Sequence, residues 1–84
     1  MNSSVDVQKV KIGVVGAGSW GTALANLLAV KGFHVDHWVY ETDVLAQMIN
    51  ERENPRFLPG VPLSDRLQPS GDLTSVVADK DMVL

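Results

Sequence analysis

Apolar and polar positions along this chain repeat first with the period of a strand and then with the period of a helix. Residues 10–15 form a short, mostly β-branched run bounded by polar residues and glycine, as is typical of a buried parallel strand, although Gly13 interrupts it. From Ser19 onward the spacing predicts a helix that ends at Lys31-Gly32, a cation followed by a glycine. The residues expected on its inward face are Trp20, Ala23, Leu24, Leu27 and Leu28.

The same two periods then follow each other again. A second strand is expected at about residues 34–40. Thr42 or Asp43 is expected to cap the next helix, and Asn54-Pro55 is expected to stop it. The inward stripe of this second helix comprises Leu45, Met48 and Ile49. Its last residues, 51–53, are charged, and we interpret Glu51, Arg52 and Glu53 as a solvated helix end.

The remaining residues predict shorter elements. Residues 66–70 are read as a short strand, Asp72 as the cap of a helical turn that reaches Ala78, and residues 81–84 as the start of another strand. Strands that alternate with helices of this length indicate a parallel sheet with right-handed crossovers. The fold class is therefore α/β, and residues 1–84 form one unit with a flexible N-terminal segment over residues 1–9.

One long connection lacks periodicity. Residues 54–66 hold three of the four prolines, Pro55, Pro59 and Pro62, together with Gly60. Compact domains rarely keep a loop of this length without a use for it. We expect this loop to border a functional site.

The junction between the first strand and the first helix carries the clearest chemical signal. Gly16, Gly18 and Gly21 form the spacing GxGxxG. Gly16 permits a tight turn, Gly18 leaves no Cβ to keep a pyrophosphate from the backbone, and Gly21 lets the helix pack close to the strand. A helix start offers unpaired N–H groups and a positive dipole end to an anion. Glu41 follows Gly21 by about twenty residues, at the end of the second strand, so the pattern predicts a Rossmann-type dinucleotide site.

Competing interpretations of these residues are weaker. The glycines could serve packing alone. A Walker phosphate loop needs Lys and then Ser or Thr after its last glycine, whereas Ser19 and Trp20 stand there. His34 and His37 flank Asp36, but residues three apart on a strand point to opposite faces, so we expect structural roles and no metal site.

Composition narrows the function classes further. The net charge is −3, with seven basic and ten acidic residues, which gives no support for nucleic-acid binding. The chain has no cysteine, which fits a reducing compartment. No window approaches the roughly 20 apolar residues that span a bilayer, and the first residues do not resemble a secretory signal. We expect a cytoplasmic protein without membrane insertion.

Three strings, "GAGSWGTALA", "NPRFLPGVPL" and "DKDMVL", together resemble the N-terminal part of bacterial-type NAD(P)-dependent glycerol-3-phosphate dehydrogenases. The resemblance implies interconversion of sn-glycerol 3-phosphate and dihydroxyacetone phosphate, which supplies the backbone of membrane phospholipids. It also implies that Ser19 and Trp20 touch the cofactor, that Tyr40 and Glu41 face the adenosine ribose, and that Phe57 lines the adenosine side. The family often has Arg or Asp where this chain has Glu41.

Cofactor preference rests on Glu41. An acid at this position accepts hydrogen bonds from the ribose 2′-OH of NAD, whereas it repels the 2′-phosphate of NADP. NAD is therefore the preferred cofactor and NADP the alternative. Arg52 or Arg56 would offset the charge of Glu41 if either folded over the adenosine.

The resemblance also implies what this chain does not contain. The substrate lysine and the catalytic lysine of the family lie downstream, in segments that this chain does not contain, so no catalytic residue is assigned here. In the family, an all-helical substrate domain follows the nucleotide-binding domain. We expect a truncated Rossmann-type sheet that is inactive alone and self-associates, with the small phosphorylated substrate bound only by a full-length protein. A stand-alone redox-sensing nucleotide-binding module, or another dehydrogenase of the same superfamily, remain the alternatives.

Overall fold

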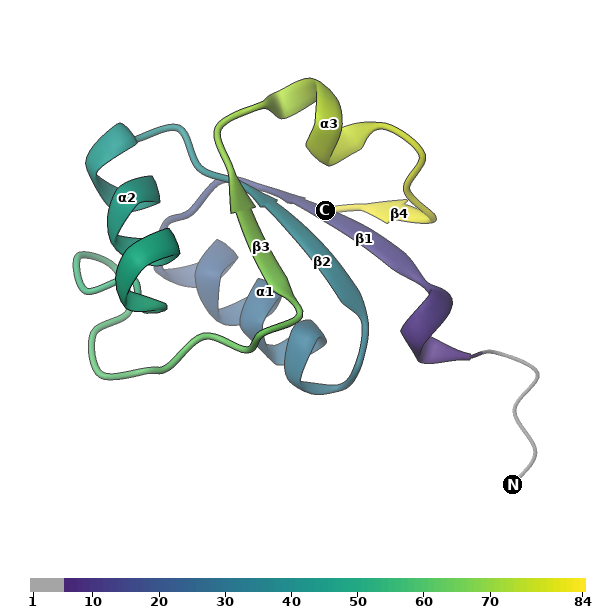
Figure 1. Ribbon diagram of the computed structural model, residues 1–84, viewed down its shortest axis with the longest axis horizontal. Coiled ribbons are helices and arrows are strands. Elements are labelled where there is room, and N and C mark those ends of the chain that lie inside the picture. Colours follow the sequence, from purple (N-terminus) through teal and green to yellow (C-terminus); the bar gives the residue numbers. More distant parts are fainter. Residues whose placement is uncertain (1–5) are drawn as a thin grey trace.

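The computed structural model describes residues 6–84 as a four-stranded, all-parallel sheet with helices on both faces (Figure 1). The strands are β1 (Lys11–Val15), β2 (His34–Trp38), β3 (Leu67–Ser70) and β4 (Met82–Val83), in the order β3-β2-β1-β4. The helices are α1 (Ser19–Val30), α2 (Thr42–Glu51) and α3 (Leu73–Val77). The order of strands in the sheet reverses direction at β1, as in one half of a doubly wound Rossmann sheet, so the predicted fold class is confirmed.

Alternate residues of β1 face different helices. Ile12 and Val14 are buried in the core beneath α1 and α2. Gly13 points to the other face, where an added Cβ would collide with the carbonyl oxygen of Val76 in α3. The glycine that interrupts the strand pattern is thus the position at which α3 approaches β1 most closely.

Helix α1 forms where the spacing predicted it, and its predicted inward face is right only in part, because Leu28 packs against the core whereas Trp20 and Leu27 are exposed. The residues of α1 that are buried are Thr22, Ala25, Asn26 and Ala29. Trp20 is 79% exposed and Leu27 is 52% exposed, although both were expected to face inward. A Cβ on Gly21 would lie 2.5 Å from the carbonyl oxygen of Gly16. Because the helix runs this close to the turn, small residues fit against the sheet and the large apolar residues are displaced to its flanks.

Helix α2 differs from its prediction at both ends. Glu41, rather than Thr42 or Asp43, precedes the first helical residue, and its side chain makes no capping hydrogen bond. Arg52 adopts a left-handed conformation with φ 53°, so the helix stops before Asn54-Pro55 is reached. The buried side chains are Val44 and Met48, whereas the expected inward residue Ile49 is 50% exposed.

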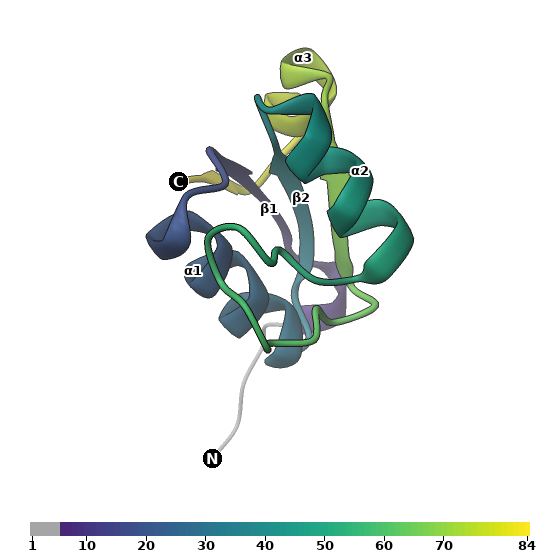
Figure 2. The ribbon, with the colours of Figure 1, turned by 90° about the vertical axis from the view of Figure 1, so that its left-hand side faces the viewer.

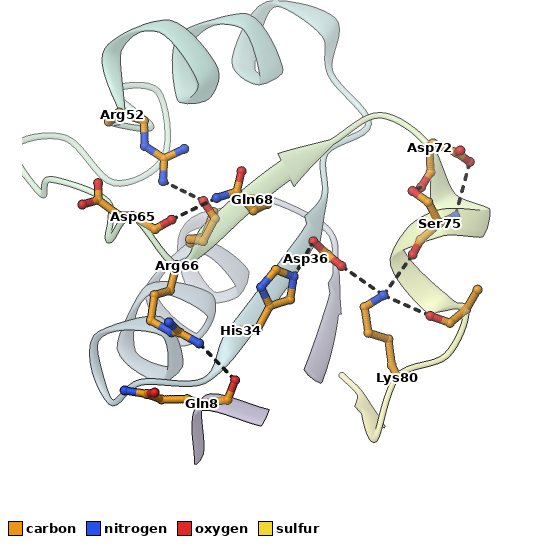
Figure 3. Close-up of polar contacts among 12 residues, drawn as sticks. Gln8, His34, Asp36, Arg52, Asp65, Arg66, Gln68, Asp72, Ser75 and Lys80 are labelled. Carbon is orange, nitrogen blue, oxygen red and sulfur yellow. Dashed lines mark hydrogen bonds and ion pairs between the residues drawn. The ribbon is translucent and has the colours of Figure 1, made fainter. Parts of the chain in front are cut away.

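Residues 52–66, here called the linking loop, connect α2 to β3 and pass in front of α1 (Figure 2). Arg52 donates hydrogen bonds to the carbonyl oxygens of Ser64 and Leu67, both at 2.6 Å, and so ties the start of the loop to its end. Figure 3 shows Arg52 beside the start of β3. The carboxylate of Glu53 accepts a hydrogen bond from the N–H of Gly60 at 2.9 Å. The interpretation of Arg52 and Glu53 as a solvated helix end is therefore wrong, because both side chains hold the loop.

The later elements agree with the sequence pattern. Asp72 caps α3 by accepting hydrogen bonds from the N–H groups of Thr74 and Ser75. Figure 3 shows Asp72 beside Ser75 at the start of this helix. Lys80 follows α3, with its side chain only 6% exposed, and forms an ion pair with Asp36 at 3.0 Å. Within residues 6–84, no helix is long and apolar enough to cross a bilayer.

The predicted flexible segment over residues 1–9 falls partly outside the described residues, which begin at residue 6. Val7–Lys9 form a short 3-10 turn, for which the Asp6 side chain accepts a hydrogen bond from the N–H of Gln8. Arg66 donates a hydrogen bond to the carbonyl oxygen of Gln8 at 3.2 Å (Figure 3). The residues nearest β1 thus contact the end of the linking loop.

Candidate functional site

The three glycines of the β1–α1 junction have three distinct environments. Gly16 has φ +102°, a conformation that favours glycine, and its N–H donates to the carbonyl oxygen of Trp38 at the end of β2 at 3.0 Å. Gly18 immediately precedes α1, and a Cβ added there would meet no atom within 4 Å. The expected turn role of Gly16 and the packing role of Gly21 are therefore confirmed, and the surroundings of Gly18 are open at the surface.

Beneath this glycine turn, buried side chains hold two backbone carbonyls. The Nε2–H of His37 donates to the carbonyl oxygen of Gly16 at 2.5 Å. The carbonyl oxygen of Ala17 accepts hydrogen bonds from Thr22 Oγ1 at 3.1 Å and from Asn54 Nδ2 at 3.0 Å. With the carbonyls engaged on the inner side, the unpaired N–H groups that begin α1 are left at the outer side, where an anion can bind.

His37 is fully buried and acts as a structural donor. Burial lowers the pKa of His37 below 6.5, against a smaller raising effect of the hydrogen bond to Gly16. Its Nδ1 is buried without a hydrogen-bond partner. His34 and Asp36 lie on the opposite face, where His34 Nε2 is 3.2 Å from Asp36 Oδ1 (Figure 3). Among residues 6–84, no three histidine, aspartate or glutamate side chains cluster as metal ligands do.

The linking loop places Phe57 against the start of α1. Ser19 Oγ donates a hydrogen bond to the carbonyl oxygen of Phe57 at 2.5 Å. The guanidinium of Arg56 lies 5.2 Å from the centre of the Phe57 ring and 3.5 Å from a carboxylate oxygen of Asp43 in the first turn of α2. The loop thus joins the starts of α1 and α2 at the carboxyl edge of the sheet, where ligands bind in open α/β folds.

Tyr40 and Glu41 follow β2 at the same edge. Tyr40 is 75% exposed, and its ring lies 5.9 Å from that of Trp38. Glu41 is half-buried directly before α2. Trp20, in the first turn of α1, presents the other large exposed aromatic surface at this edge.

The predicted site residues therefore come from three segments at one edge of the sheet. Ser19 and Phe57 are in direct contact. Glu41 is two residues from Asp43, which forms the ion pair with Arg56 of the linking loop. The glycine turn is joined to β2 by the hydrogen bond from the N–H of Gly16 to the carbonyl oxygen of Trp38. Sequence reasoning missed Thr22 and Asn54, which are both fully buried. The available signal was the position of Asn54 at the start of the proline-rich loop, a polar residue next to a predicted site.

Comparisons with known proteins agree with this arrangement. The family described as "NAD-dependent glycerol-3-phosphate dehydrogenase N-terminus" matches residues 11–84. Glycerol-3-phosphate dehydrogenase [NAD(P)+] of Syntrophobacter fumaroxidans is 49% identical over 73 residues, which are 87% of this chain and 22% of that protein. The enzyme of the same name from Citrifermentans bemidjiense is 50% identical over 74 residues, 88% of this chain and 22% of that protein.

Solved structures give the same relationship. The crystal structure of glycerol-3-phosphate dehydrogenase from Coxiella burnetii superposes with a TM-score of 0.83 and 41% identity, over 90% of this chain and 23% of that one. The yeast glycerol-3-phosphate dehydrogenase structure gives a TM-score of 0.77 and 31% identity, over 88% of this chain and 25% of that one. This chain thus spans about 22% of the length of the curated relatives that it matches. By its family match, its sequence and its fold, the chain belongs to the NAD-dependent glycerol-3-phosphate dehydrogenase family. It corresponds to the N-terminal region of that family.

Proposed function

We propose that this chain binds a nicotinamide dinucleotide at the glycine turn, as the cofactor-binding part of an oxidoreductase that interconverts sn-glycerol 3-phosphate and dihydroxyacetone phosphate. The observation that carries the proposal is the open space over Gly18 at the start of α1, above carbonyls that are held inward. A backbone without a Cβ at this position can approach a pyrophosphate closely. The relatives named above are NAD(P)-dependent enzymes of this reaction.

The residues at the sheet edge fit such a ligand. The turn of Gly16, Gly18 and Gly21 would hold the pyrophosphate, with Ser19 and Trp20 beside it. Tyr40, Glu41 and Phe57 would face the adenosine half, for which the exposed ring of Tyr40 provides a stacking surface. The ring of Phe57 is half-buried against the core. A nicotinamide dinucleotide held by these residues would supply the hydride transfer that interconverts sn-glycerol 3-phosphate and dihydroxyacetone phosphate.

The wider setting belongs to the same proposal. The phosphorylated substrate is one that a complete protein of this family binds, and its product supplies phospholipid synthesis. We place the protein in the cytoplasm, in keeping with a chain that has no cysteine. None of the residues of this chain is assigned to the chemical step.

We further infer that NAD(H) is preferred over NADP(H). The Glu41 carboxylate is not used to cap α2, so it is available to accept hydrogen bonds from a ribose. A 2′-phosphate next to the same carboxylate would be repelled. Of the two arginines that could offset this charge, Arg52 is engaged with the carbonyl oxygens of Ser64 and Leu67. Arg56 is within 3.5 Å of Asp43, at the start of α2.

Binding is tested by titrating the chain with NADH and following the fluorescence of its two tryptophans, Trp20 and Trp38. We expect saturable quenching, because Trp20 lies in the first turn of α1. In Gly18→Val, we expect the Kd to rise by about tenfold or more, which corresponds to about 1.4 kcal/mol per tenfold change. The urea midpoint should stay unchanged, since the new side chain extends into open space. An unchanged Kd in the folded variant would contradict the proposed site.

Cofactor preference is tested by the ratio of the Kd for NADPH to the Kd for NADH. The wild-type chain should give a ratio above one, and Glu41→Arg should lower the ratio below one by replacing repulsion with attraction. Glu51→Arg is the matched control, because it makes the same charge change at the opposite end of α2 and should leave the ratio unaltered. A wild-type ratio below one would show that Glu41 does not exclude the 2′-phosphate.

Catalysis is tested in a complete protein that carries this segment. Oxidation of NADH upon addition of dihydroxyacetone phosphate is followed by absorbance at the nicotinamide band. We expect turnover with this substrate and its loss in Gly18→Val. A protein that binds NADH but does not consume it with dihydroxyacetone phosphate would contradict the proposed reaction and would leave the proposed cofactor site in place.

A further inference from the structure

We propose that Asn54 is a positioning residue that couples the linking loop to the glycine turn, so that cofactor affinity depends on a side chain that does not touch the cofactor. The proposal rests on the proposed function of the glycine turn. It concerns a buried amide that connects the two segments expected to hold opposite halves of the ligand.

Asn54 uses both ends of its amide for this connection. Its Nδ2 group donates to the carbonyl oxygen of Ala17 at 3.0 Å and to Thr22 Oγ1 at 2.9 Å. Its Oδ1 accepts a hydrogen bond from the N–H of Phe57 at 3.2 Å. The donor end therefore engages the glycine turn and α1, and the acceptor end engages the loop residue expected to line the adenosine.

Phe57 is held at both polar groups of its backbone. Its N–H donates to Asn54, and its carbonyl oxygen accepts the hydrogen bond from Ser19 Oγ. Ser19 is the first residue of α1, so the two contacts fix Phe57 relative to the helix start. Without the Asn54 contact, the remaining polar contact between the Phe57 backbone and α1 would be the one from the exposed hydroxyl of Ser19, beside the packing of the Phe57 side chain against the core.

Because Asn54 is buried, its hydrogen bonds cannot easily be replaced. Asn54 and Thr22 are both 0% exposed, so water cannot replace a lost hydrogen bond. Buried polar groups without partners are costly, and a partly satisfied network is worse than none. An aspartate at position 54 would keep the acceptor toward Phe57 but would place a carboxylate oxygen against the carbonyl oxygen of Ala17. The substitution therefore breaks the link that ties position 54, and with it Phe57, to the glycine turn and α1.

Asn26 provides a matched control because its side chain also connects α1 with the linking loop. Its Nδ2 group donates to the carbonyl oxygen of Pro62 at 3.2 Å, and its Oδ1 accepts from the N–H of Ser64 at 2.7 Å. It is 8% exposed. Asn26 thus ties the loop to α1 by the same chemistry, but at a part of the loop that carries no predicted cofactor contact.

The experiment compares NADH affinity in the wild-type chain, Asn54→Asp and Asn26→Asp, with urea unfolding of each. We expect the Kd for NADH to rise by about tenfold in Asn54→Asp. A tenfold change in Kd is about the size expected when one well-placed interaction is lost. Asn26→Asp should lower the urea midpoint but keep its Kd within about twofold of the wild-type value. A change in Kd of about twofold is smaller than the loss of one such interaction would cause. Equal losses of affinity in the two variants, or a wild-type Kd in folded Asn54→Asp, would overturn the proposal.

Amide resonances supply a readout that a loss of stability alone would not change. In ¹⁵N-labelled wild-type chain, NADH should shift the resonances of Gly18 and Phe57 together. In Asn54→Asp at saturating NADH, the Gly18 resonance should still shift, whereas the Phe57 resonance should not. If both resonances shift as in the wild type, Asn54 does not position the loop.

Thr22→Val keeps the test decisive if Asn54→Asp does not fold. This nearly isosteric change removes the hydroxyl that accepts from Asn54 and donates to Ala17, and we expect a smaller rise in Kd with the same separation of the two resonances. Wild-type affinity in Thr22→Val would then overturn the proposal. The two proposals fail differently: an unchanged Kd in Gly18→Val refutes the proposed site, whereas lost affinity in Gly18→Val with wild-type affinity in Asn54→Asp refutes only the positioning role.

Discussion

Neighbouring glycines in one turn can be required for unrelated reasons, and the difference decides which substitution affects folding. A Cβ at Gly21 would lie 2.5 Å from the carbonyl oxygen of Gly16, which belongs to the backbone and cannot move aside. A Cβ at Gly18 would lie in open space, and its backbone has φ −66°, which any residue can adopt. The fold therefore constrains Gly21, whereas only the proposed ligand constrains Gly18.

The buried imidazole of His37 makes stability depend on pH. In the folded chain Nε2–H donates to the Gly16 carbonyl, so protonation would add a hydrogen at Nδ1, which is buried without a partner. Burial accordingly lowers the pKa of His37 below the ordinary value of 6.5. The unfolded chain then binds more protons than the folded chain in the window between the two pKa values. The stabilisation is present above pH 6.5 and is lost as the pH falls below it.

We expect the free energy of unfolding of the wild-type chain to fall on acidification below pH 6.5, by up to about 1.4 kcal/mol per pH unit. His37→Gln should lose this dependence, because the amide can still donate to Gly16 but does not titrate. Urea unfolding at about pH 7.5 and about pH 5.5 measures the difference, in a range where a histidine changes charge. His34→Gln is the control and should keep the wild-type dependence. A pH-independent wild type would contradict this role for His37.

At the scale of elements, the linking loop is organised by side chains whose partners are backbone carbonyls. Arg52 reaches the carbonyl oxygens of Ser64 and Leu67, so one guanidinium closes the loop at its two ends. Asn54 attaches the start of the loop to Thr22 of α1, and Asn26 of α1 binds the later loop residues Pro62 and Ser64. A loop without regular secondary structure can thus hold a defined shape, which a ligand-binding edge needs.

We expect Arg52→Ala to lower the free energy of unfolding by about 2 kcal/mol, since hydrogen bonds from a charged donor contribute about 1.5–3 kcal/mol. Arg56→Ala is the control. Its ion pair with Asp43 is long, at 3.5 Å, and both side chains are more than half exposed, so the change should be within about 0.5 kcal/mol. Urea denaturation monitored by circular dichroism compares the two variants. Equal effects would show that the Arg52 contacts do not stabilise the loop.

How far the sequence predicts these elements depends on whether their partners are local. The strands and the capped turn of α3 follow from residues within a few positions of one another, such as Asp72 with Thr74 and Ser75. The roles of Asn54 and Arg52 were missed because their partners become neighbours only in the fold. Asn54 bonds Ala17 across 37 positions and Thr22 across 32.

The inward face of α1 shows a different limit of prediction from the sequence. Large apolar residues at helical spacing indicated a stripe through Trp20 and Leu27, and this inference gives large side chains more weight than small ones. Because Gly21 brings the helix against the turn, the fully buried positions of α1 nearest the turn are taken by the small residues Thr22 and Ala25. The same glycine pattern that predicted the turn could have predicted the small inward residues, because close packing leaves little room for side chains.

For the whole molecule, the sheet order leaves β4 at an edge. This strand pairs with β1 on one side, while α3 packs on the face of the sheet rather than along its edge. Met82, Val83 and Leu84 are each about half exposed, with values of 52%, 46% and 46%. An open, apolar edge strand can pair with another chain. We therefore expect the 84-residue chain to associate through this edge.

We expect sedimentation velocity of the 84-residue chain to show association that increases with protein concentration. Val83→Lys should reduce this association, because a charged side chain on an edge strand disfavours pairing with a second copy. Leu27→Lys is the matched control: it replaces an apolar residue of similar exposure, 52%, on α1, away from the strand edge. Association that Leu27→Lys reduces and Val83→Lys does not would place the contact on α1. A wild-type chain that stays monomeric at all concentrations would show that the β4 edge does not pair.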